Sequence, residues 1–140
     1  MTSSDRAALV LIPGLACDGE VWSDTIADLA ELADCHVADI TQALSIADMA
    51  EAVLASAPDR FALAGHSLGG YVSFEILRRA PERVTRLALI GTSARPDTPT
   101  VAARRRKMIE RAESGEYDPV IEGLLPAVIA RQRQNDEGLV

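Results

Sequence analysis

The sequence has few cysteines, few histidines and no long apolar run, and each shortage excludes a class of protein. Cys17 and Cys35 are its two cysteines, too few for a disulfide framework or a cysteine-based metal cluster. We therefore expect two reduced, partly buried thiols and no metal site. Cys17 follows the first expected strand closely enough that it could contact a ligand. The sequence shows no base that would make it a nucleophile.

The apolar runs are too short for a membrane helix, which needs roughly 18 apolar residues. The N-terminus also lacks the basic start, longer apolar stretch and small-residue cleavage site of a secretory signal. These absences predict a cytoplasmic protein with no membrane partner.

Positive charge is scarce, since 14 Lys and Arg face 21 Asp and Glu and give a formal net charge of −7 at pH 7. Nucleic-acid-binding proteins present basic surfaces, so this balance argues against a nucleic-acid partner. One run is basic, Arg104-Arg105-Arg106-Lys107. It could bind an anion, although such a run is more often a solvated helix face. The length of 140 residues makes a single domain the default.

Short apolar runs alternate with helical patterns in the first two thirds of the chain. Apolar runs predict strands at residues 7–12, 35–40, 60–64 and 84–90. Apolar spacing and the capping box that begins at Ser45 predict helices at residues 20–33, 46–57 and 68–80. Strands and helices that alternate at this spacing imply right-handed crossovers, so the fold class is α/β with a mostly parallel, doubly wound sheet.

The pattern becomes purely helical beyond the fourth expected strand. Thr98-Pro99 and Asp118-Pro119 both combine a capping side chain with a proline suited to the first helical position. Pro126 should kink the second of these helices. We expect residues 1–97 to form the sheet domain and residues 98–140 to form a separate helical segment.

A Gly-x-Ser-x-Gly pattern, Gly65-His66-Ser67-Leu68-Gly69, stands between the third strand and a strongly apolar helix. Alone the pattern is weak, but strand-to-helix context is what a nucleophile elbow requires. The residues two before and two after the serine meet in so tight a turn, and Gly65 and Gly69 are small enough to fit. Ser67 is then a candidate nucleophile. The Leu68 amide lies at the helix N-terminus, where negative charge is favoured.

The loop Pro13-Gly14-Leu15 follows the first strand. In a doubly wound sheet, ligands bind where the strand order reverses. If the order is 2-1-3-4 in chain numbering, this loop faces Ser67. Gly14 permits a close backbone approach, and the Leu15 amide can point at the same oxyanion as that of Leu68, as acyl transfer requires. An ordinary turn is the alternative for this loop.

Three features of the sequence carry a family resemblance, namely Ile12-Pro13-Gly14-Leu15, Trp22 and Gly65-His66-Ser67-Leu68-Gly69-Gly70. They resemble the α/β-hydrolase superfamily, in particular its small carboxylesterase and lactonase-like members. The resemblance covers about residues 7–93. It implies that Ser67 is the nucleophile, that Leu15 and Leu68 supply the oxyanion hole, and that no cofactor is needed. It also implies that residues 98–140 begin the helical cap of these enzymes. Many members have histidine where this chain has Pro13, a position that shapes the loop and is no triad member.

The catalytic base of that family is missing from the sequence. The triad follows the order Ser, acid, His, but both histidines, His36 and His66, precede Ser67. His66 adjoins the serine, where its side chain cannot normally reach the hydroxyl, and packing and hydrogen bonding are its expected roles. Asp97 lies where some hydrolases place the acid, but without a histidine to orient its catalytic role is unsupported.

We therefore expect a truncated chain that lacks the C-terminal part of the core, with its acid and histidine. Such a chain should be nearly inactive alone and should self-associate through the exposed edge of its fourth strand. The leading hypothesis is a serine hydrolase that acts on a small-molecule ester, thioester or lactone through an acyl-Ser67 intermediate. An acyltransferase or perhydrolase, and a non-catalytic hydrolase-like binding scaffold, are the alternatives. A dehalogenase would need a carboxylate nucleophile in place of Ser67.

Overall fold

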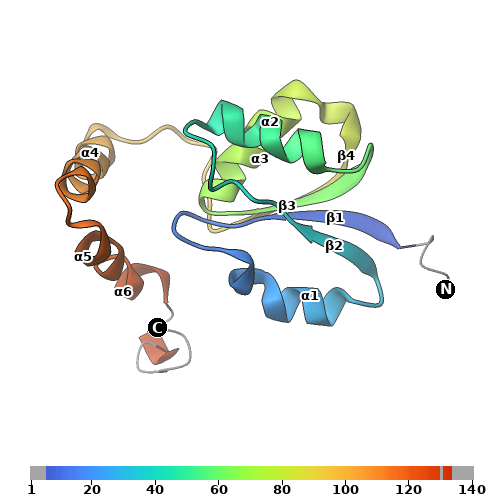
Figure 1. Ribbon diagram of the computed structural model, residues 1–140, viewed down its shortest axis with the longest axis horizontal. Helices are drawn as coiled ribbons and strands as arrows, with labels where there is room; N and C mark the ends of the chain where they lie inside the picture. The colour runs from blue at the N-terminus through green and yellow to red at the C-terminus, as the bar shows by residue number, and fades with distance from the viewer. Residues whose placement is uncertain (1–5, 130, 134–140) are drawn as a thin grey trace. The chain divides into compact units, whose positions relative to one another are not determined.

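The computed structural model describes residues 6–129 and 131–133 of the chain, which forms two compact units, residues 1–94 and 95–140 (Figure 1). Residues 1–5, most of the polar N-terminal segment that lacks the features of a secretory signal, lie outside the described residues. So does part of the expected helical segment 98–140, namely residues 130 and 134–140.

The first unit is built on a four-stranded sheet in the order β2-β1-β3-β4. Its strands are β1 Ala7–Ile12, β2 Ala33–Val37, β3 Phe61–His66 and β4 Val84–Ile90. All three pairings are parallel, as the alternation of strands and helices predicted. The order reverses between β1 and β3, whose carboxyl ends pair Ile12 with Gly65. The expected order 2-1-3-4 and the α/β fold class are thus confirmed.

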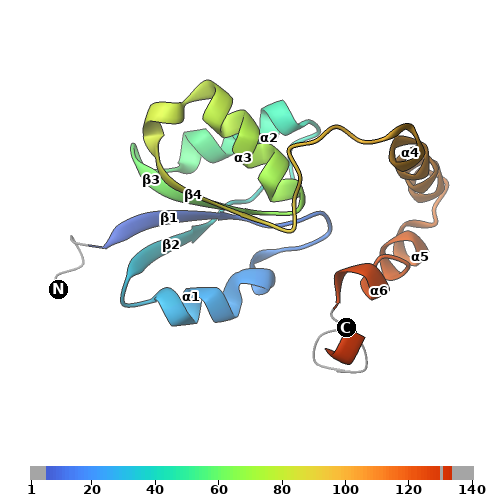
Figure 2. The same cartoon turned by 180° about the vertical axis from the view of Figure 1, so that it is seen from behind.

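Helices cover both faces of the sheet (Figure 2). On one face lie α2 Ile46–Ser56 and α3 Leu68–Arg79, and on the other lie the 3₁₀ turn η1 Gly19–Trp22 and α1 Ser23–Leu29. The larger core cluster joins the strands to α2 and α3. Its best-buried aliphatic and aromatic members include Val10, Ile12, Val53, Phe61, Leu63, Val72 and Ile76. The smaller cluster centres on Leu11, Trp22 and Ala64.

The expected boundaries shift where sheet pairing overrides the apolar pattern. The helix predicted to end at residue 33 ends at Leu29, and β2 begins at Ala33, because Ala33 already pairs with Ala7 of β1. β2 therefore ends at Val37 rather than at residue 40. Similarly, β3 extends to His66, since its last residue still pairs with Ile90 of β4.

The capping predictions at Ser45 and Thr98 are confirmed. Ser45 Oγ accepts a hydrogen bond of 3.1 Å from the Asp48 amide at the start of α2. Thr98 Oγ1 accepts one of 3.3 Å from the Val101 amide at the start of α4 Pro99–Glu113. By contrast, α3, the strongly apolar helix of the sequence, is buried mainly on one side. Val72 and Ile76 are buried on its sheet-facing side, while other apolar side chains of the helix are only half-buried.

The second unit continues with α5 Tyr117–Glu122, α6 Leu125–Val128 and the 3₁₀ turn η3 Arg131–Arg133. Asp118 is not the cap of α5, which begins one residue earlier and has Glu116 at its N-cap. The expected kink at Pro126 is a break between α5 and α6, because proline has no N–H to donate to the carbonyl of Glu122. No helix in the described residues has the length and apolarity to cross a membrane.

Candidate active site

Ser67 occupies a strained turn between β3 and α3. Its backbone angles are φ 51° and ψ −110°, a conformation that favours glycine and costs a serine about 1–3 kcal/mol. The Ser67 amide donates to the Ile90 carbonyl at 2.9 Å, and the Gly70 amide donates to the Ser67 carbonyl at 3.0 Å. The turn is therefore anchored on both the end of β4 and the first turn of α3. The Ser67 hydroxyl makes no capping hydrogen bond to the first turn of α3.

The two glycines of the motif are needed because the chain segments around Ser67 nearly touch. A Cβ on Gly65 would meet the Gly69 carbonyl oxygen and Ser73 Oγ. A Cβ on Gly69 would meet the carbonyl of Ile12 and would lie 2.8 Å from the Pro13 carbonyl oxygen. The Gly65–Gly69 contact is the close approach that the spacing predicted. The contact of Gly69 with Ile12 packs the end of β1 against the start of α3.

The loop after β1 lies directly beside Ser67. A Cβ on Gly14 would be 3.3 Å from Ser67 Cβ. The loop turns back through a 3.2 Å hydrogen bond from the Cys17 amide to the Gly14 carbonyl. Among the described residues, the Leu15 amide has no acceptor, and the Leu68 amide is one of the first N–H groups of α3, which have no acceptor within the helix.

Backbone strain gathers in these two loops. Ser67 and Ala16, with φ 51° and φ 55°, are the non-glycine residues of positive φ in the part of the chain that the structure describes. One lies in the turn after β3 and the other in the loop after β1. Such outliers cluster at functional sites, where the surrounding structure holds them. The sequence offered no signal for Ala16, because alanine carries no preference for this conformation.

His66 lies between the loops that follow β1 and β4. Its ring is within reach of both glycines there, since a Cβ on Gly14 would be 2.9 Å from Nδ1 and one on Gly91 would be 3.7 Å from Nε2. Trp22 meets this ring edge to face, with centroids 6.5 Å apart and an interplanar angle of 88°. Nδ1 is buried without a hydrogen-bond partner among the described residues, and the contacts of the ring with Gly14, Gly91 and Trp22 are packing contacts.

Two further polar groups near this turn are buried without partners in the described structure, Trp22 Nε1 and Thr92 Oγ1. Thr92 follows β4 and lies over the start of α3, because a Cβ on Gly70 would clash with its side chain. A threonine in a loop gives no sequence signal of such a position, so the sequence missed it.

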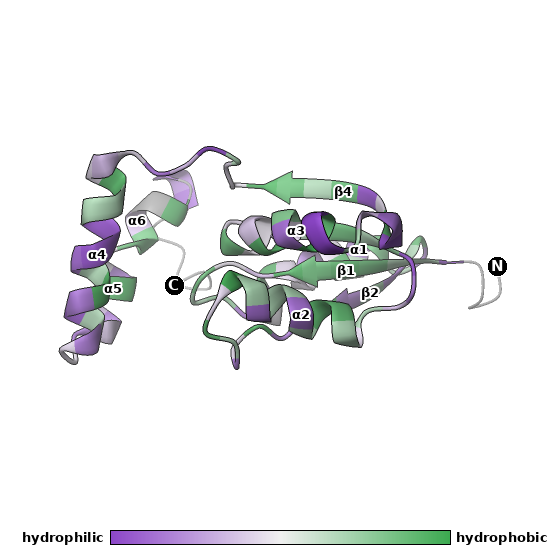
Figure 3. Ribbon diagram, turned by 90° about the horizontal axis from the view of Figure 1, so that it is seen from above, coloured by the Kyte–Doolittle hydropathy of each residue, from purple (hydrophilic) through white to green (hydrophobic). Residues whose placement is uncertain are grey.

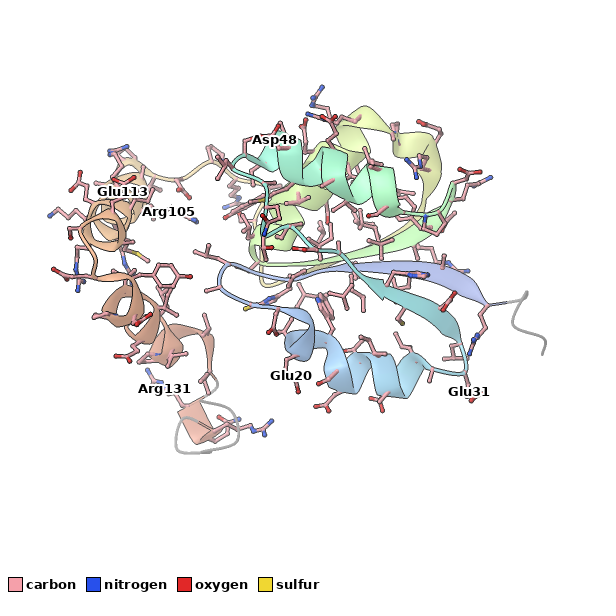
Figure 4. The ribbon with its side chains drawn as sticks, in the orientation of Figure 1. Glu20, Glu31, Asp48, Arg105, Glu113 and Arg131 are labelled. Atoms are coloured by element: carbon pink, nitrogen blue, oxygen red, sulfur yellow. The ribbon has the colours of Figure 1, made fainter. Side chains whose placement is uncertain are left out.

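The other titratable candidates lie elsewhere. His36 is exposed on β2, which β1 separates from β3, and its Nε2 is 3.5 Å from Asp34 Oδ2. Asp97 belongs to the second unit, where its carboxylate pairs with Arg105 Nε at 2.8 Å; Figure 4 labels Arg105 on α4.

A cavity of about 400 Å³ adjoins the loop after β1. It is lined by that loop, the start of η1, the end of β2 and the segment after it, namely Pro13, Cys17, Asp18, Gly19, Val37, Ala38, Asp39, Ile40 and Thr41. The Cys17 thiol is turned to the Leu15 carbonyl, at 3.5 Å. Cys35 is a free thiol elsewhere on the sheet, and partial burial, with the Asp34 charge adding, raises its pKa.

The Thioesterase domain family matches residues 23–138 of this chain. A curated relative, the pimeloyl-[acyl-carrier protein] methyl ester esterase of Pectobacterium carotovorum subsp. carotovorum, is 41% identical over 93 residues. That match covers 61% of this chain and 36% of the esterase, so the chain spans little more than a third of that relative.

Two solved structures show the same fold. A malate-bound thermophilic esterase from Thermogutta terrifontis superposes with a TM-score of 0.78 at 22% identity, over 95% of this chain and 54% of that one. Est816, an N-acyl homoserine lactone degrading enzyme, gives a TM-score of 0.74 at 18% identity, over 96% and 55%. The match over residues 23–138 shows that this chain belongs to the thioesterase domain family, and the two structures show that it has the α/β-hydrolase fold.

Proposed function

We propose that this protein is a serine hydrolase that attacks a small-molecule ester, thioester or lactone with Ser67 and forms an acyl-enzyme. The backbone of Ser67 carries the proposal: φ 51° and ψ −110° in a turn from β3 into α3. This conformation costs free energy, and nothing in the packing of a plain strand-to-helix connection requires it. Membership of an esterase-containing family supports the same chemistry.

The oxyanion hole of the proposed enzyme consists of the Leu15 and Leu68 amides. Gly14 brings the first loop to within 3.3 Å of the Ser67 side chain, measured from an ideal Cβ position. The Leu15 amide has no other acceptor in the described residues, and α3 directs the positive end of its dipole toward the turn. Each such donor is worth about 10²–10³ in kcat in serine hydrolases.

The general base of a serine hydrolase is the catalytic group that these 140 residues do not supply. His36 is exposed on β2, His66 packs between Gly14 and Gly91, and no histidine follows Ser67 in the sequence. Loss of the base from a serine triad costs on the order of 10⁶ in kcat, and the remaining groups keep about 10³–10⁴ over the uncatalysed rate. We therefore propose that the 140 residues alone are nearly inactive and that the activating histidine is not among them.

We further propose that residues 98–140 are the start of the helical cap and that the cavity lined by Pro13 and Cys17 receives part of the substrate. Its apolar side chains, which include Val37 and Ile40, suit an acyl chain. A cytoplasmic location remains a prediction of the sequence.

Fluorophosphonate labelling tests the nucleophile, because this reagent phosphonylates activated serines. The chain is incubated with the reagent with and without imidazole, a soluble substitute for the missing base, and the modified peptide is located by mass spectrometry. We expect selective modification of Ser67, accelerated by imidazole and absent in Ser67→Ala. Ser23→Ala, which changes an exposed serine of the first unit, should leave the labelling unchanged. Labelling spread evenly over several serines would refute the proposal.

A non-catalytic binding scaffold is the second candidate, favoured by the same lack of a histidine after Ser67. The two differ in what Ser67→Ala does to the biological activity of the protein. A scaffold keeps its activity when the hydroxyl is removed, whereas a hydrolase loses it.

A further inference from the structure

The second unit contains a groove of about 830 Å³ between α4 and α5, a size typical of small-molecule sites. It begins on the first turn of α4, at Pro99 and Thr100. Three basic side chains of α4 line it, namely Arg104, Lys107 and Arg111. Because they are three and four residues apart, they lie on one face of the helix.

The lining between these charges is apolar. Met108 of α4, together with Val120 of α5 and Leu124 after it, contributes to the groove, and Val120 is 7% exposed. A solvated basic helix face has no such neighbours. The groove therefore combines an apolar floor with a basic rim, which is the surface that an anionic amphiphile requires.

Among the residues that the structure describes, two of the rim charges have no acidic partner. Arg111 pairs with Glu116 at 2.8 Å, and Arg105, outside the groove, pairs with Asp97 at 2.8 Å. In the described part of the chain, no carboxylate lies within the 4.0 Å ion-pair distance of Arg104 or Lys107. Within that part of the chain, the groove thus presents two cations without a carboxylate partner, one helical turn apart.

We propose that this groove binds a single-chain amphiphile with a phosphate headgroup. A phosphate monoester carries a charge of about −1.5 to −2 at pH 7, which matches Arg104 and Lys107 together, whereas a carboxylate would balance only one of them. The guanidinium of Arg104 can hold two phosphate oxygens at once, and Lys107 adds a mobile point charge. The tail then lies along Met108, Val120 and Leu124. This site is independent of Ser67 and of the proposed hydrolysis.

Methionine-methyl NMR gives a direct test, because the chain has three methionines and Met108 lines the groove. The full chain, labelled with ¹³C at its methionine methyl groups, is titrated with dodecyl phosphate below its critical micelle concentration. We expect a saturable shift of the Met108 signal, assigned with Met108→Leu. Met49, which packs against the core of the first unit, should not move. Inorganic phosphate and the uncharged dodecyl maltoside should each bind at least about tenfold more weakly.

Variants separate a specific site from general attraction. Arg104→Gln and Lys107→Gln should each raise Kd about tenfold or more, since a hydrogen bond to a charged group is worth that factor. Lys107→Arg, which keeps the charge, should bind within about threefold of the original. Arg106→Gln is the matched control, because Arg106 belongs to the same basic run but does not line the groove. Circular dichroism checks that each variant keeps its helices.

Three results would overturn the proposal. One is a Met108 shift that does not saturate or that Met49 shares. Another is an equal loss of affinity in Arg106→Gln and Arg104→Gln, which would mean attraction by net charge alone. The third is equal binding of dodecyl maltoside, which would make the groove a site for apolar chains without a phosphate requirement.

Discussion

At the scale of single residues, the two site loops are held in conformations that their side chains do not favour. Ser67 and Ala16 both have positive φ, and they follow the carboxyl ends of the neighbouring strands β3 and β1. Close packing around Ser67 explains why the chain tolerates its strained conformation. The backbone approaches Gly65 and Gly69 so closely that a Cβ on either would meet backbone atoms, and the turn has no space to relax.

Replacing Ser67 by glycine should stabilise the fold while it removes the proposed nucleophile. Glycine adopts φ 51° without the strain of about 1–3 kcal/mol, and loses about 0.5–1 kcal/mol through its greater freedom when unfolded. We expect Ser67→Gly to raise the free energy of urea unfolding by about 1 kcal/mol over that of Ser67→Ala, which keeps the strain. If Ser67→Gly is the less stable of the two, the turn is not strained.

Adding a methyl group to Gly69 should be strongly destabilising. The new Cβ would meet the Ile12 carbonyl, which cannot move without shifting β1, so we expect a loss of about 3 kcal/mol in urea unfolding. Gly19→Ala is the control in the same unit, because its Cβ would make ordinary contacts with Val37 at 3.7 Å and beyond. It should change the unfolding free energy by less than about 1 kcal/mol. Equal losses in both variants would contradict the close contact at Gly69.

At the scale of elements, Arg83 joins the end of α2 to the start of β4. Its guanidinium donates to carbonyls in the last turn of α2 and just after it, at 2.9 Å to Leu54, 2.9 Å to Ala57 and 2.8 Å to Pro58. It also lies 5.5 Å from the centre of the Phe61 ring. The sequence predicted a helix that ends at residue 57. It did not show that a side chain 25 residues later satisfies the freed carbonyls.

Arg83→Gln should lower the free energy of unfolding by about 2 kcal/mol, because charge-assisted hydrogen bonds to several carbonyls are lost together. Arg83→Lys should recover little of this, since an ammonium cannot reach carbonyls spread over a planar fork. Urea unfolding measures both, and Arg86→Gln, on exposed β4, should change stability by less than about 0.5 kcal/mol. If Arg86→Gln lowers the free energy of unfolding as much as Arg83→Gln does, the hydrogen bonds of Arg83 are not the cause of its effect.

An ion cluster on α3 should make stability fall in acid. Hydrogen bonds from Arg78 and Arg79 lower the pKa of Glu75 from 4.5 to about 2. Arg79 also lies 3.7 Å from Glu51 of α2. Because the unfolded chain takes up the Glu75 proton first, this contribution is complete above about pH 4.5 and is lost as the pH falls toward 2.

Urea unfolding measured at a series of pH values from about 5 to about 2, a range that includes both pKa values of Glu75, tests the cluster. Glu75→Gln should remove part of the downward slope, because glutamine does not titrate. Glu82→Gln, at an exposed position outside the cluster, should keep that part. An identical slope in the original chain and in Glu75→Gln would contradict the role of this carboxylate.

At the scale of the whole molecule, charge and apolar surface are unevenly distributed. No Lys or Arg occurs between Ala7 and Asp59, and the labelled Glu20, Glu31 and Asp48 point outward from the elements of this stretch (Figure 4). At the other edge of the sheet, β4 is largely apolar (Figure 3), and Leu87 and Ile90 are 41% and 43% exposed. Among the described strands, β4 has a partner on one side only.

Self-association through β4 therefore remains a prediction of both sequence and structure. Sedimentation velocity should show a sedimentation coefficient that rises with protein concentration. Leu87→Lys should reduce the rise, because a lysine on an edge strand opposes pairing with another strand. Val37→Lys, on the opposite edge strand β2, should have little effect. A stronger effect of Val37→Lys would place the contact on β2.

Short-range patterns in the sequence determined the elements and the tight turn. A cap acts within three residues, as at Ser45 and Thr98, and a strand or helix shows its period within a few more. The parallel order of the strands followed because crossovers have a fixed hand. The glycines that flank Ser67 are part of the same local pattern, although its catalytic role remains a prediction.

Tertiary packing alone decided the features that join distant segments. It ended α1 at Leu29 to bring β2 into register, set Arg83 beneath α2, and held the His66 ring between two loops. It also turned part of a basic run into the rim of an apolar groove at Arg104 and Lys107. Each depends on which surfaces meet in the folded chain, and a local sequence pattern does not show contacts between residues far apart in the chain.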